Sequence, residues 1–359
     1  MSSSPTSVWM EIVSGRRAGL LAAAGRAGLC VLTPLYAAAM SLRNQSFDRG
    51  WRTPARVDAT VISIGNLTAG GTGKTPTVAW VVQKLQALHA RPAIISRGYG
   101  SQDGANDEKR LLDQLLPGVP HLLNPDRVAA ARTLLAPEAG ALSPNVLVLD
   151  DAFQHRRIAR DFDLVLVDCL NPWGFGHLFP RGLLREPLRS LQRATCALLT
   201  RCDQVDEATQ QGIKDTIRCW TSAPILASSF QPTRLVNGDG DGEVRRVEEL
   251  PALRVAAFCG IGNPVGFRRT LTRLGVAIPD DRFRTFPDHH HYQPGDLDAL
   301  GQWANSVRAD GLLTTQKDLV KIPHAALKGV PLWALGIELR FDTAEAESQL
   351  IELLRAAVK

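Results

Sequence analysis

The chain has 359 residues, 45% of them hydrophobic, and this length fits two α/β domains with an N-terminal appendage better than one ordinary domain. Its net charge of +5 comes from the first 56 residues, which hold seven arginines and two acidic residues. No nucleic-acid partner is expected. The six cysteines show no C-x-x-C pair and no disulfide-like spacing, so they indicate reduced thiols in a cytosolic protein rather than a secreted, disulfide-linked scaffold.

The basic N-terminus also contains an apolar stretch, Ala18–Leu42, which Arg26 and Pro34 interrupt. The uninterrupted part from Ala27 is shorter than the ~20 residues that a membrane span needs. Three interpretations compete: a signal peptide, a buried core helix, and a helix lying in the inner face of a membrane with its arginines on anionic head groups. We favour the third, because a signal peptide conflicts with the nucleotide-binding loop that comes next.

That loop lies between a strand predicted at Val57–Ile64 and a helix predicted at Pro76–Leu88. It follows the Walker A pattern except that a threonine replaces the first glycine. Lys74 would reach the β- and γ-phosphates of ATP, Thr75 would ligate Mg²⁺, and backbone N–H groups would hold the phosphate oxygens. The predicted nucleotide-binding residues are Thr68, Ala69, Gly70, Gly71, Thr72, Gly73, Lys74 and Thr75.

Further strands alternate with helices along the chain. The helices are predicted at Arg127–Leu135 and over a segment that reaches Arg218, and a polar loop is predicted at Ser101–Lys109. This alternation predicts a doubly wound parallel sheet, like that of P-loop NTPases, with ligands at the carboxyl ends of the strands. The predicted strands are Pro92–Ser96, Asn145–Leu149, Asp163–Asp168 and Thr195–Thr200.

Asp150 and Asp151 follow one of these strands directly, which is the Walker B arrangement. A carboxylate at this position holds Mg²⁺, directly or through water, on the Thr75 side of the site. Acidic residues after a strand are also common as helix caps. The phosphate loop earlier in the same sheet favours the metal role for the pair.

The helical pattern stops near Ser222–Gln231, and Pro232–Glu249 has a turn-rich centre, Asn237–Gly242, typical of a hairpin. A second α/β pattern then begins. We therefore predict an N-terminal membrane-associating segment (1–50), a P-loop nucleotide-binding domain (51–225), a β-hairpin linker (226–250) and a second α/β domain (251–359). The elements predicted in this last part are Val255–Phe258, Val265–Leu274, Gly311–Thr315, Pro331–Ile337 and Thr343–Val358.

Phosphoryl transfer needs a group that accepts the proton of the attacking hydroxyl, and two segments offer one: Asn106-Asp107-Glu108 and Pro287–Tyr292. The second segment contains three consecutive histidines. Histidines in an extended segment alternate faces, so a metal site is a weaker interpretation than a catalytic role, and a solvated loop stays possible. Arg181 and Arg185-Glu186 lie in a loop suited to bind an anionic substrate.

Several motifs occur in one order over residues 60–322: GNLTAGGTGKTP, SRGYG, LDDAFQH, PRGLLREPL, GIGNP, FPDHHHY and TTQKD followed by a lysine. Together with the apolar basic N-terminus, they resemble the tetraacyldisaccharide 4'-kinase family of the lipid A pathway. The resemblance covers nearly the whole chain.

The resemblance implies two α/β domains joined by a small β linker, with the active site between them. It implies transfer of the γ-phosphate of ATP, with Mg²⁺, to the 4'-hydroxyl of a tetraacylated glucosamine disaccharide 1-phosphate, giving the lipid IVA precursor. The enzyme would be a peripheral protein at the cytoplasmic face of the bacterial inner membrane, held there by its N-terminal helix through contact with anionic lipid. A monomer is expected.

Site roles follow from the same resemblance. It implies that Lys74 and Thr75 hold the phosphates and Mg²⁺, with Asp150 and Asp151 serving the metal, that Asp107 is the general base, and that His289 orients or tunes it. The substrate-side residues that it indicates are Asn66, Arg97, Gln154, His155, Arg185 and Glu186. The chain departs from the family pattern at Asn106, Ala152 and Gln316, where the family has glycine, glycine and glutamate.

Two other classes of protein share part of this pattern. A nucleotide-switch ATPase of the partitioning or metal-chaperone type shares the Gly-Gly-x-Gly-Lys-Thr core, but its signature lysine would stand where this chain has Ala69. A non-catalytic membrane scaffold would leave Lys74, Asp107 and Asp150 unexplained together. A kinase and a switch differ in whether ATP turnover requires a lipid acceptor and yields a phosphorylated lipid.

Overall fold

The computed structural model describes residues 5–98, 107–136, 142–237 and 245–358. The chain divides into two compact units. Unit 1 comprises Met1–Arg97, Pro120–Ser229 and Phe341–Lys359, and unit 2 comprises Gly98–Val119 and Phe230–Arg340. The chain therefore crosses between the units four times, whereas the sequence predicted consecutive domains.

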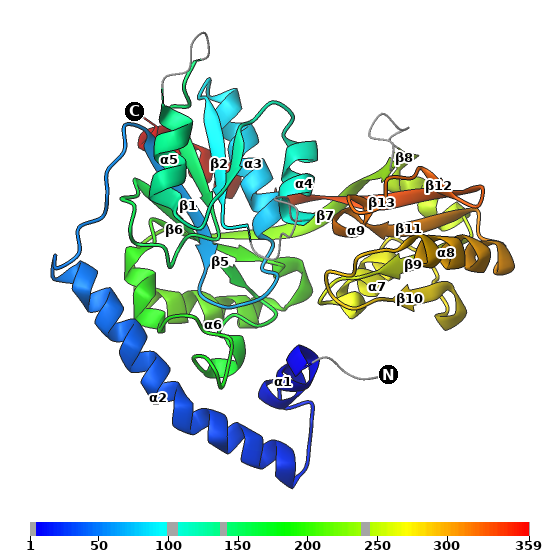
Figure 1. The fold of residues 1–359 in the computed structure, drawn as a ribbon, viewed down its shortest axis with the longest axis horizontal. Helices are drawn as coiled ribbons and strands as arrows, with labels where there is room; N and C mark the ends of the chain where they lie inside the picture. The colour runs from blue at the N-terminus through cyan, green and yellow to red at the C-terminus, as the bar shows by residue number, and fades with distance from the viewer. Residues whose placement is uncertain (1–4, 99–106, 137–141, 238–244, 359) are drawn as a thin grey trace. The chain divides into compact units, whose positions relative to one another are not determined.

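Unit 1 is built on a parallel sheet in the order β7-β6-β5-β1-β4-β2-β3 (Figure 1). The central strands are buried on both faces, which explains their mainly apolar sequences. β1 lies between β4 and β5, so that its carboxyl end, where the phosphate loop begins, is in the middle of the sheet. The strands are β1 (Thr60–Asn66), β2 (Pro92–Ser96), β3 (His121–Leu123), β4 (Val146–Asp150), β5 (Phe162–Asp168), β6 (Cys196–Thr200) and β7 (Ile225–Asn237).

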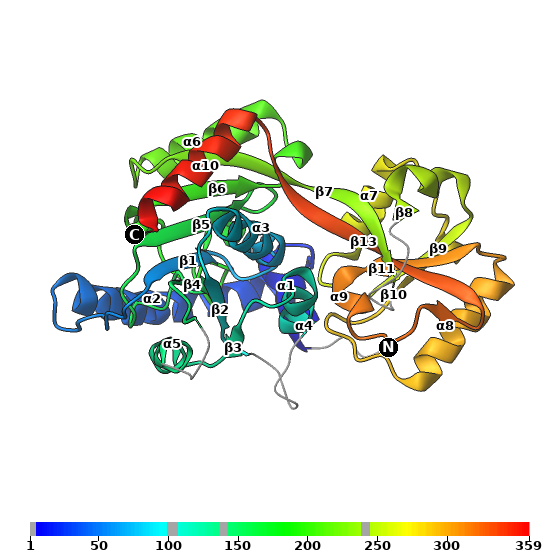
Figure 2. The ribbon, with the colours of Figure 1, turned by 90° about the horizontal axis from the view of Figure 1, so that it is seen from above.

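Helices cover both faces of this sheet (Figures 1 and 2). α3 (Lys74–Ala87) packs on β1 and β4 and also contacts α10 (Ala344–Ala357). On the other face, apolar residues of α5 (Arg127–Leu135) pack with those of β4, and α6 (Glu207–Arg218) packs with β5 and β6. Side-chain caps begin three of these helices, since Asp126, Asp206 and Thr343 accept hydrogen bonds from their first turns.

The N-terminal segment forms two helices, α1 (Pro5–Val13) and α2 (Leu20–Asp48). α2 continues through Arg26 and Pro34, which interrupt its apolar stretch but not the helix, and over its 29 residues it is long and apolar enough to cross a membrane. Large apolar side chains point outward from it; Leu20 is 91% exposed and Leu35 is 70% exposed. The interpretation of this segment as a buried core helix is therefore wrong, whereas the exposed apolar surface fits membrane association.

Unit 2 has a smaller sheet in which β10-β9-β11-β13 pair in parallel (Figure 2). Its strands are β8 (Arg245–Arg246), β9 (Val255–Cys259), β10 (Phe283–Thr285), β11 (Gly311–Thr315), β12 (Ala326–Leu327) and β13 (Val330–Phe341). α7 (Pro264–Arg273) contributes to one apolar core beside this sheet and α8 (Pro294–Ser306) contributes to another. α4 (Asp107–Leu115) contacts α9 (Gln316–Leu319). Short 3-10 turns lie at Gly174–Gly176, Leu188–Arg193, Cys202–Gln204, Val247–Ala252 and Asp280–Arg282.

The prediction of an α/β chain with a mainly parallel sheet and an N-terminal apolar helix is confirmed. Boundaries differ in detail. The predicted polar loop Ser101–Lys109 is wrong at its end, because Asp107 already begins α4, where its carboxylate favours the positive helix terminus. Antiparallel β7 and β8 occupy the predicted linker, and residues 238–242 of the predicted turn lie outside the described residues.

Candidate active site

The phosphate loop connects the end of β1 to the first residue of α3, Lys74. Gly70 and Gly73 have φ angles of 123° and 88°, a region that other residues rarely adopt. Gly73 is the N-cap of α3, so the loop delivers its backbone N–H groups to a helix N-terminus. This geometry suits a phosphate group.

A neighbouring segment holds one side of the loop. Thr68 forms a β-bridge with Leu184, the backbone N–H of Ala69 donates to Leu183 (2.8 Å), and that of Arg185 donates to Leu67 (2.7 Å). Thr68 is buried in this extended pairing and has no positive φ. Threonine at the first Walker A position is therefore compatible with the loop conformation, because this position does not need the positive φ that only glycine adopts easily.

The other side of the loop is held from the end of β6. The hydroxyl of Thr200 donates to the carbonyl of Thr72 (3.1 Å), and a guanidinium nitrogen of Arg201 donates to the carbonyl of Gly71 (2.6 Å). Arg201 also forms an ion pair with Asp168 at the end of β5. Thr200 and Arg201 were not predicted as site residues, although they lie at the end of a buried strand just as Asp150 and Asp151 do.

Lys74 is held between two oxygens of the site. Its ammonium donates to the side-chain oxygen of Asn66 (3.3 Å) and lies 3.7 Å from a carboxylate oxygen of Asp151. The guanidinium of Arg185 contacts the same Asp151 oxygen at 2.8 Å. Burial alone would raise the pKa of Asp151, but Lys74 and Arg185 outweigh it and hold that pKa below its usual value. Asp151 is therefore ionised at neutral pH.

Asp150 lies at the buried end of β4, where it accepts a hydrogen bond from Ser96 (3.2 Å). Arg127, a buried arginine that the sequence analysis also missed, donates to the backbone carbonyl of Asp150 (3.3 Å). At the next residue the chain turns through a left-handed conformation, with φ of 50° at Asp151. Ala152 has no positive φ, so alanine in place of the family glycine strains nothing there.

The donor set suits Mg²⁺. Thr75, Asp150 and Asp151 offer hard oxygen ligands, and Mg²⁺ is usually held by one or two carboxylates together with substrate phosphates. The described residues contain no group of three or more His, Cys, Asp or Glu side chains that could hold a metal by themselves. A magnesium ion bound here would thus depend on the nucleotide phosphates for its remaining ligands.

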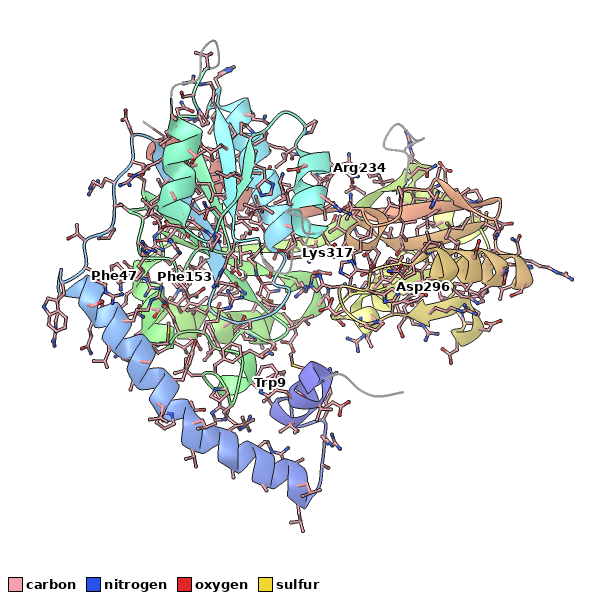
Figure 3. The ribbon with its side chains drawn as sticks, in the orientation of Figure 1. Trp9, Phe47, Phe153, Arg234, Asp296 and Lys317 are labelled. Carbon is pink, nitrogen blue, oxygen red and sulfur yellow. The ribbon has the colours of Figure 1, made fainter. Side chains whose placement is uncertain are left out.

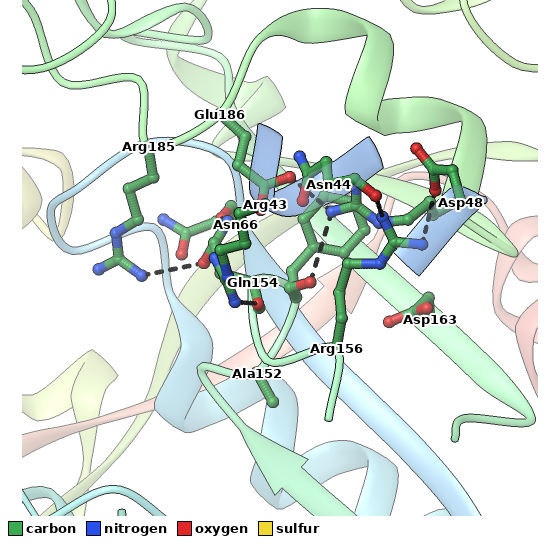
Figure 4. Close-up of polar contacts among 12 residues, drawn as sticks. Arg43, Asn44, Asp48, Asn66, Ala152, Gln154, Arg156, Asp163, Arg185 and Glu186 are labelled. Carbon is green, nitrogen blue, oxygen red and sulfur yellow. Dashed lines mark hydrogen bonds and ion pairs between the residues drawn. The ribbon is translucent and has the colours of Figure 1, made fainter. Parts of the chain in front are cut away.

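The predicted substrate-side residues of unit 1 fall into two groups. Asn66, Gln154 and Arg185 form one network, in which Gln154 donates to the carbonyl of Asn66 (2.9 Å) and accepts from Arg185 (3.4 Å) (Figure 4). His155 lies beside this network, and burial, aided by Arg127, lowers its pKa to about 4, so that it is neutral at pH 7. Arg97 is exposed just after β2.

Glu186 lies apart from that network. Its carboxylate is fully buried and pairs with Arg193 at 2.6 Å, and Figure 4 shows it on a different side from its neighbour Arg185. Its proposed contact with substrate stays a prediction.

The N-terminal helices dock on the segments that surround the loop. The hydroxyl of Tyr36 donates to the carbonyl of Arg185 (2.8 Å). Figure 4 shows Arg43, which donates to the carbonyl of Gln154. Trp9 of α1 (labelled in Figure 3) donates to the carbonyl of Pro180 at 3.1 Å and stacks on Phe179. The apolar N-terminus is therefore joined by hydrogen bonds to residues that support the phosphate loop.

Asp107 and His289 lie together in unit 2, although 182 residues separate them in the sequence. His289 Nδ1 is 3.2 Å from Asp107 Oδ2, and the ammonium of Lys321 is 3.1 Å from the same oxygen. Burial opposes ionisation of Asp107, but its hydrogen bond to His289 and the charge of Lys321 lower its pKa; the same hydrogen bond raises the pKa of His289. Asn106 lies outside the described residues.

The remaining residues of these motifs have structural partners. His290 contacts Asp296 at 2.9 Å at the start of α8 and stacks on Phe286, which disfavours a metal role for it. Gln316 accepts a hydrogen bond from the backbone N–H of Ile337 (3.2 Å). A glutamate at position 316 could accept the same bond, so the glutamine keeps this contact while removing one charge.

A lysine at the end of a glycine-rich loop, beside paired carboxylates on a parallel sheet, is typical of nucleotide-using proteins that transfer or hydrolyse a phosphoryl group, and it places the chain in that class. The family described as tetraacyldisaccharide-1-P 4'-kinase matches residues 26–355. The chain belongs to this family, which makes it a kinase of lipid A biosynthesis and confirms the resemblance and the activity predicted from it.

Individual relatives agree with that assignment. The chain is 37% identical to the tetraacyldisaccharide 4'-kinase of Syntrophus aciditrophicus, over 89% of this chain and 91% of the relative. It is 39% identical to the tetraacyldisaccharide 4'-kinase of Anaeromyxobacter dehalogenans strain 2CP-C, over 95% and 90%. A crystal structure of LpxK from Aquifex aeolicus in complex with ATP is similar with a TM-score of 0.72 and 28% identity, over 93% of this chain and 99% of that one.

Proposed function

We propose that this kinase transfers the γ-phosphate of ATP to the 4'-hydroxyl of a tetraacylated glucosamine disaccharide 1-phosphate. The observation that carries the proposal is the position of Lys74, at the start of α3 and between Asn66 and Asp151. Family membership supports the acceptor, and the ATP complex of the Aquifex aeolicus protein supports the donor. Unit 1 would be a P-loop NTPase-like domain and unit 2 a second α/β domain.

The donor would be held by unit 1. Backbone N–H groups of residues 70–75 and the ammonium of Lys74 would bind the β- and γ-phosphates, and Thr75, Asp150 and Asp151 would hold Mg²⁺. When bound, Mg²⁺ supplies positive charge that stabilises the phosphate oxygens during transfer. Arg185 is anchored on Asp151 and Gln154, so it would hold its guanidinium in place for an anionic group.

The acceptor would be deprotonated by Asp107. Its low pKa keeps it ionised at neutral pH, as a proton acceptor must be. A low pKa also makes it a weak base, but phosphoryl transfer passes through a loose transition state in which positioning matters more than base strength. His289 would orient the carboxylate through its bond to Oδ2.

The membrane would be reached through α2. We propose that the protein is peripheral at the cytoplasmic face of the inner membrane and monomeric, with the exposed apolar residues of α2 in the bilayer surface and the N-terminal arginines on anionic head groups. This placement brings the protein to an acceptor that is itself a membrane lipid.

Incubation of the purified chain with ATP, Mg²⁺ and the lipid disaccharide tests the reaction. We expect one phosphate to be gained on the non-reducing sugar, and ATP consumption to require the lipid. Steady ATP hydrolysis without lipid, and no phosphorylated lipid with it, would instead favour the nucleotide-switch ATPase.

Charge placed on the exposed face of α2 should release the protein from membranes. Val31 and Leu35 are 73% and 70% exposed, so the double variant Val31→Glu, Leu35→Glu removes apolar surface without disturbing a core. We expect its binding to vesicles of anionic and zwitterionic lipid to fall at least about tenfold. Leu142→Glu is the matched control, because Leu142 is 82% exposed in unit 1 but outside α2. Equal vesicle binding by the double variant and the control would contradict the membrane role of α2.

A further inference from the structure

Lys321 is a buried lysine that no part of the mechanism above uses. Its side chain is 5% exposed, and its ammonium contacts Asp107 Oδ2 at 3.1 Å and Asp318 Oδ1 at 3.4 Å. It also donates to the backbone carbonyl of His290 (3.3 Å). A buried ammonium is costly unless it is paired, and here two carboxylates and a carbonyl satisfy it.

Asp318 anchors this lysine from behind. It is fully buried, and its Oδ2 accepts hydrogen bonds from the backbone N–H of Gly260 (3.0 Å) and the hydroxyl of Thr315 (2.7 Å). Only its Oδ1 turns to Lys321. Lys321 is thus tied to the framework of unit 2 and links that framework to Asp107.

The side-chain contacts of Asp107 are made through one of its two carboxylate oxygens. The ammonium of Lys321 and Nδ1 of His289 both contact Oδ2, and the described residues provide no hydrogen bond or ion pair to Oδ1. A second ion pair, between Glu108 and Lys317 at 3.3 Å, fixes the same first turn of α4 (Lys317 is labelled in Figure 3). The carboxylate is therefore held by one oxygen while the other keeps its lone pairs for a further donor.

We propose that Lys321 is a positioning residue for phosphoryl transfer: it fixes Asp107 by Oδ2 and leaves Oδ1 to receive the proton of the acceptor hydroxyl. This inference rests on the proposed function. In the step, the hydroxyl oxygen forms a bond to the γ-phosphorus, its proton moves to Oδ1, and the bond from the γ-phosphorus to the β–γ bridging oxygen breaks, which leaves ADP.

Loss of the charge of Lys321 should shift the pH dependence of the rate in one direction. The groups that face Asp107 are Lys321 and His289, with Glu108 next to it in the chain and Asp318 behind the lysine. The hydrogen bond to His289 and the charge of Lys321 lower the pKa of Asp107 and so favour the ionised carboxylate, which must be present for proton acceptance. Loss of the ammonium should therefore raise the pKa of Asp107 and move the acid limb of the rate profile to higher pH.

Two substitutions at Lys321 separate charge from structure. In Lys321→Gln we expect kcat to fall about ten- to a hundredfold at an unchanged KM for ATP, and the acid limb to rise by about one pH unit. In Lys321→Arg the charge remains, so the acid limb should stay near that of the wild type while kcat falls, because the longer guanidinium displaces Oδ2. Lys317→Gln is the matched control; it removes the neighbouring ion pair and should leave the acid limb in place.

A second measurement keeps the inference testable if a variant loses its activity or does not fold. Carbon-13 NMR of labelled aspartate carboxyls, with the Asp107 signal assigned by its absence in Asp107→Asn, reports the pKa of Asp107 without turnover. A higher pKa in Lys321→Gln, or a wild-type pKa with reduced kcat in Lys321→Arg where the first variant does not fold, supports the inference. Wild-type pKa and pH profile in a folded Lys321→Gln, or wild-type kcat in Lys321→Arg, would overturn it. If the wild-type enzyme phosphorylated no lipid, the proposed function would be wrong. The NMR titration of Asp107 would still test whether Lys321 lowers its pKa.

Discussion

Replacement of Lys74 by alanine should reduce kcat about 10²- to 10³-fold, the loss typical of removing one donor to a developing negative charge. The side chain lies at the start of α3 with its ammonium between Asn66 and Asp151, and alanine leaves the glycine geometry of the loop unchanged. The effect should therefore fall on phosphate binding and transfer rather than on folding. Steady-state kinetics with ATP and lipid acceptor, together with a melting curve, measure both.

Lys84→Ala is the control for that variant. Lys84 belongs to the same helix but pairs with Glu347 of α10 at 2.8 Å, outside the loop. It should keep near-normal kcat. If both lysine variants lost activity to the same degree, or if Lys74→Ala kept wild-type turnover, the phosphate role of Lys74 would be refuted.

Asp107→Asn should cost about 10²- to 10⁴-fold in kcat, the range of general acid–base catalysis. Asparagine has nearly the same shape and stays at the start of α4, but it cannot take the proton of an attacking hydroxyl. Because nucleotide binding is assigned to unit 1, ATP affinity should be unchanged. The measurements are single-turnover transfer to lipid and calorimetry with ATP·Mg²⁺.

Asp113 provides the matched control on the same helix. It pairs with Lys109 at 2.6 Å, and its side chain is substantially exposed. Asp113→Asn should therefore leave transfer intact. Near-normal transfer by Asp107→Asn would remove this carboxylate from the role of base.

Local sequence patterns predicted the central strands and the phosphate loop because the physical cause of each is local. β1, β4, β5 and β6 are mostly apolar and almost fully buried, since helices or packed loops cover both faces of the sheet. β3, with three residues, and β12, with two, are too short to show a periodic pattern.

The division into units could not be predicted from local patterns. Gly98–Val119 follows a strand of unit 1 but groups with unit 2, and the C-terminal helix α10 returns to unit 1, where Glu347 meets Lys84. Both facts depend on packing between segments far apart in the sequence. No composition shift marks them.

Site residues that lie within one local motif could be predicted from the sequence, whereas those brought together from distant segments could not. Lys74 and Thr75 end a glycine-rich motif that begins at a strand, and Asp150 and Asp151 lie at the end of another strand, so motif and position were enough. Asp107 and His289 were paired only through family resemblance. Lys321 ends the motif TTQKD followed by a lysine, but it was given no role, and Arg201 was missed, because their roles arise from contacts to Asp107 and to the carbonyl of Gly71, which no local pattern encodes.

The central claim is that residues 70–75 bind the triphosphate of ATP. It can be tested by isothermal titration calorimetry of ATP into the folded protein, with and without Mg²⁺. We expect saturable, magnesium-dependent binding to the wild-type chain that weakens strongly in Lys74→Ala and stays intact in Lys84→Ala. Absence of magnesium-dependent ATP binding by a well-folded wild-type protein would contradict the account.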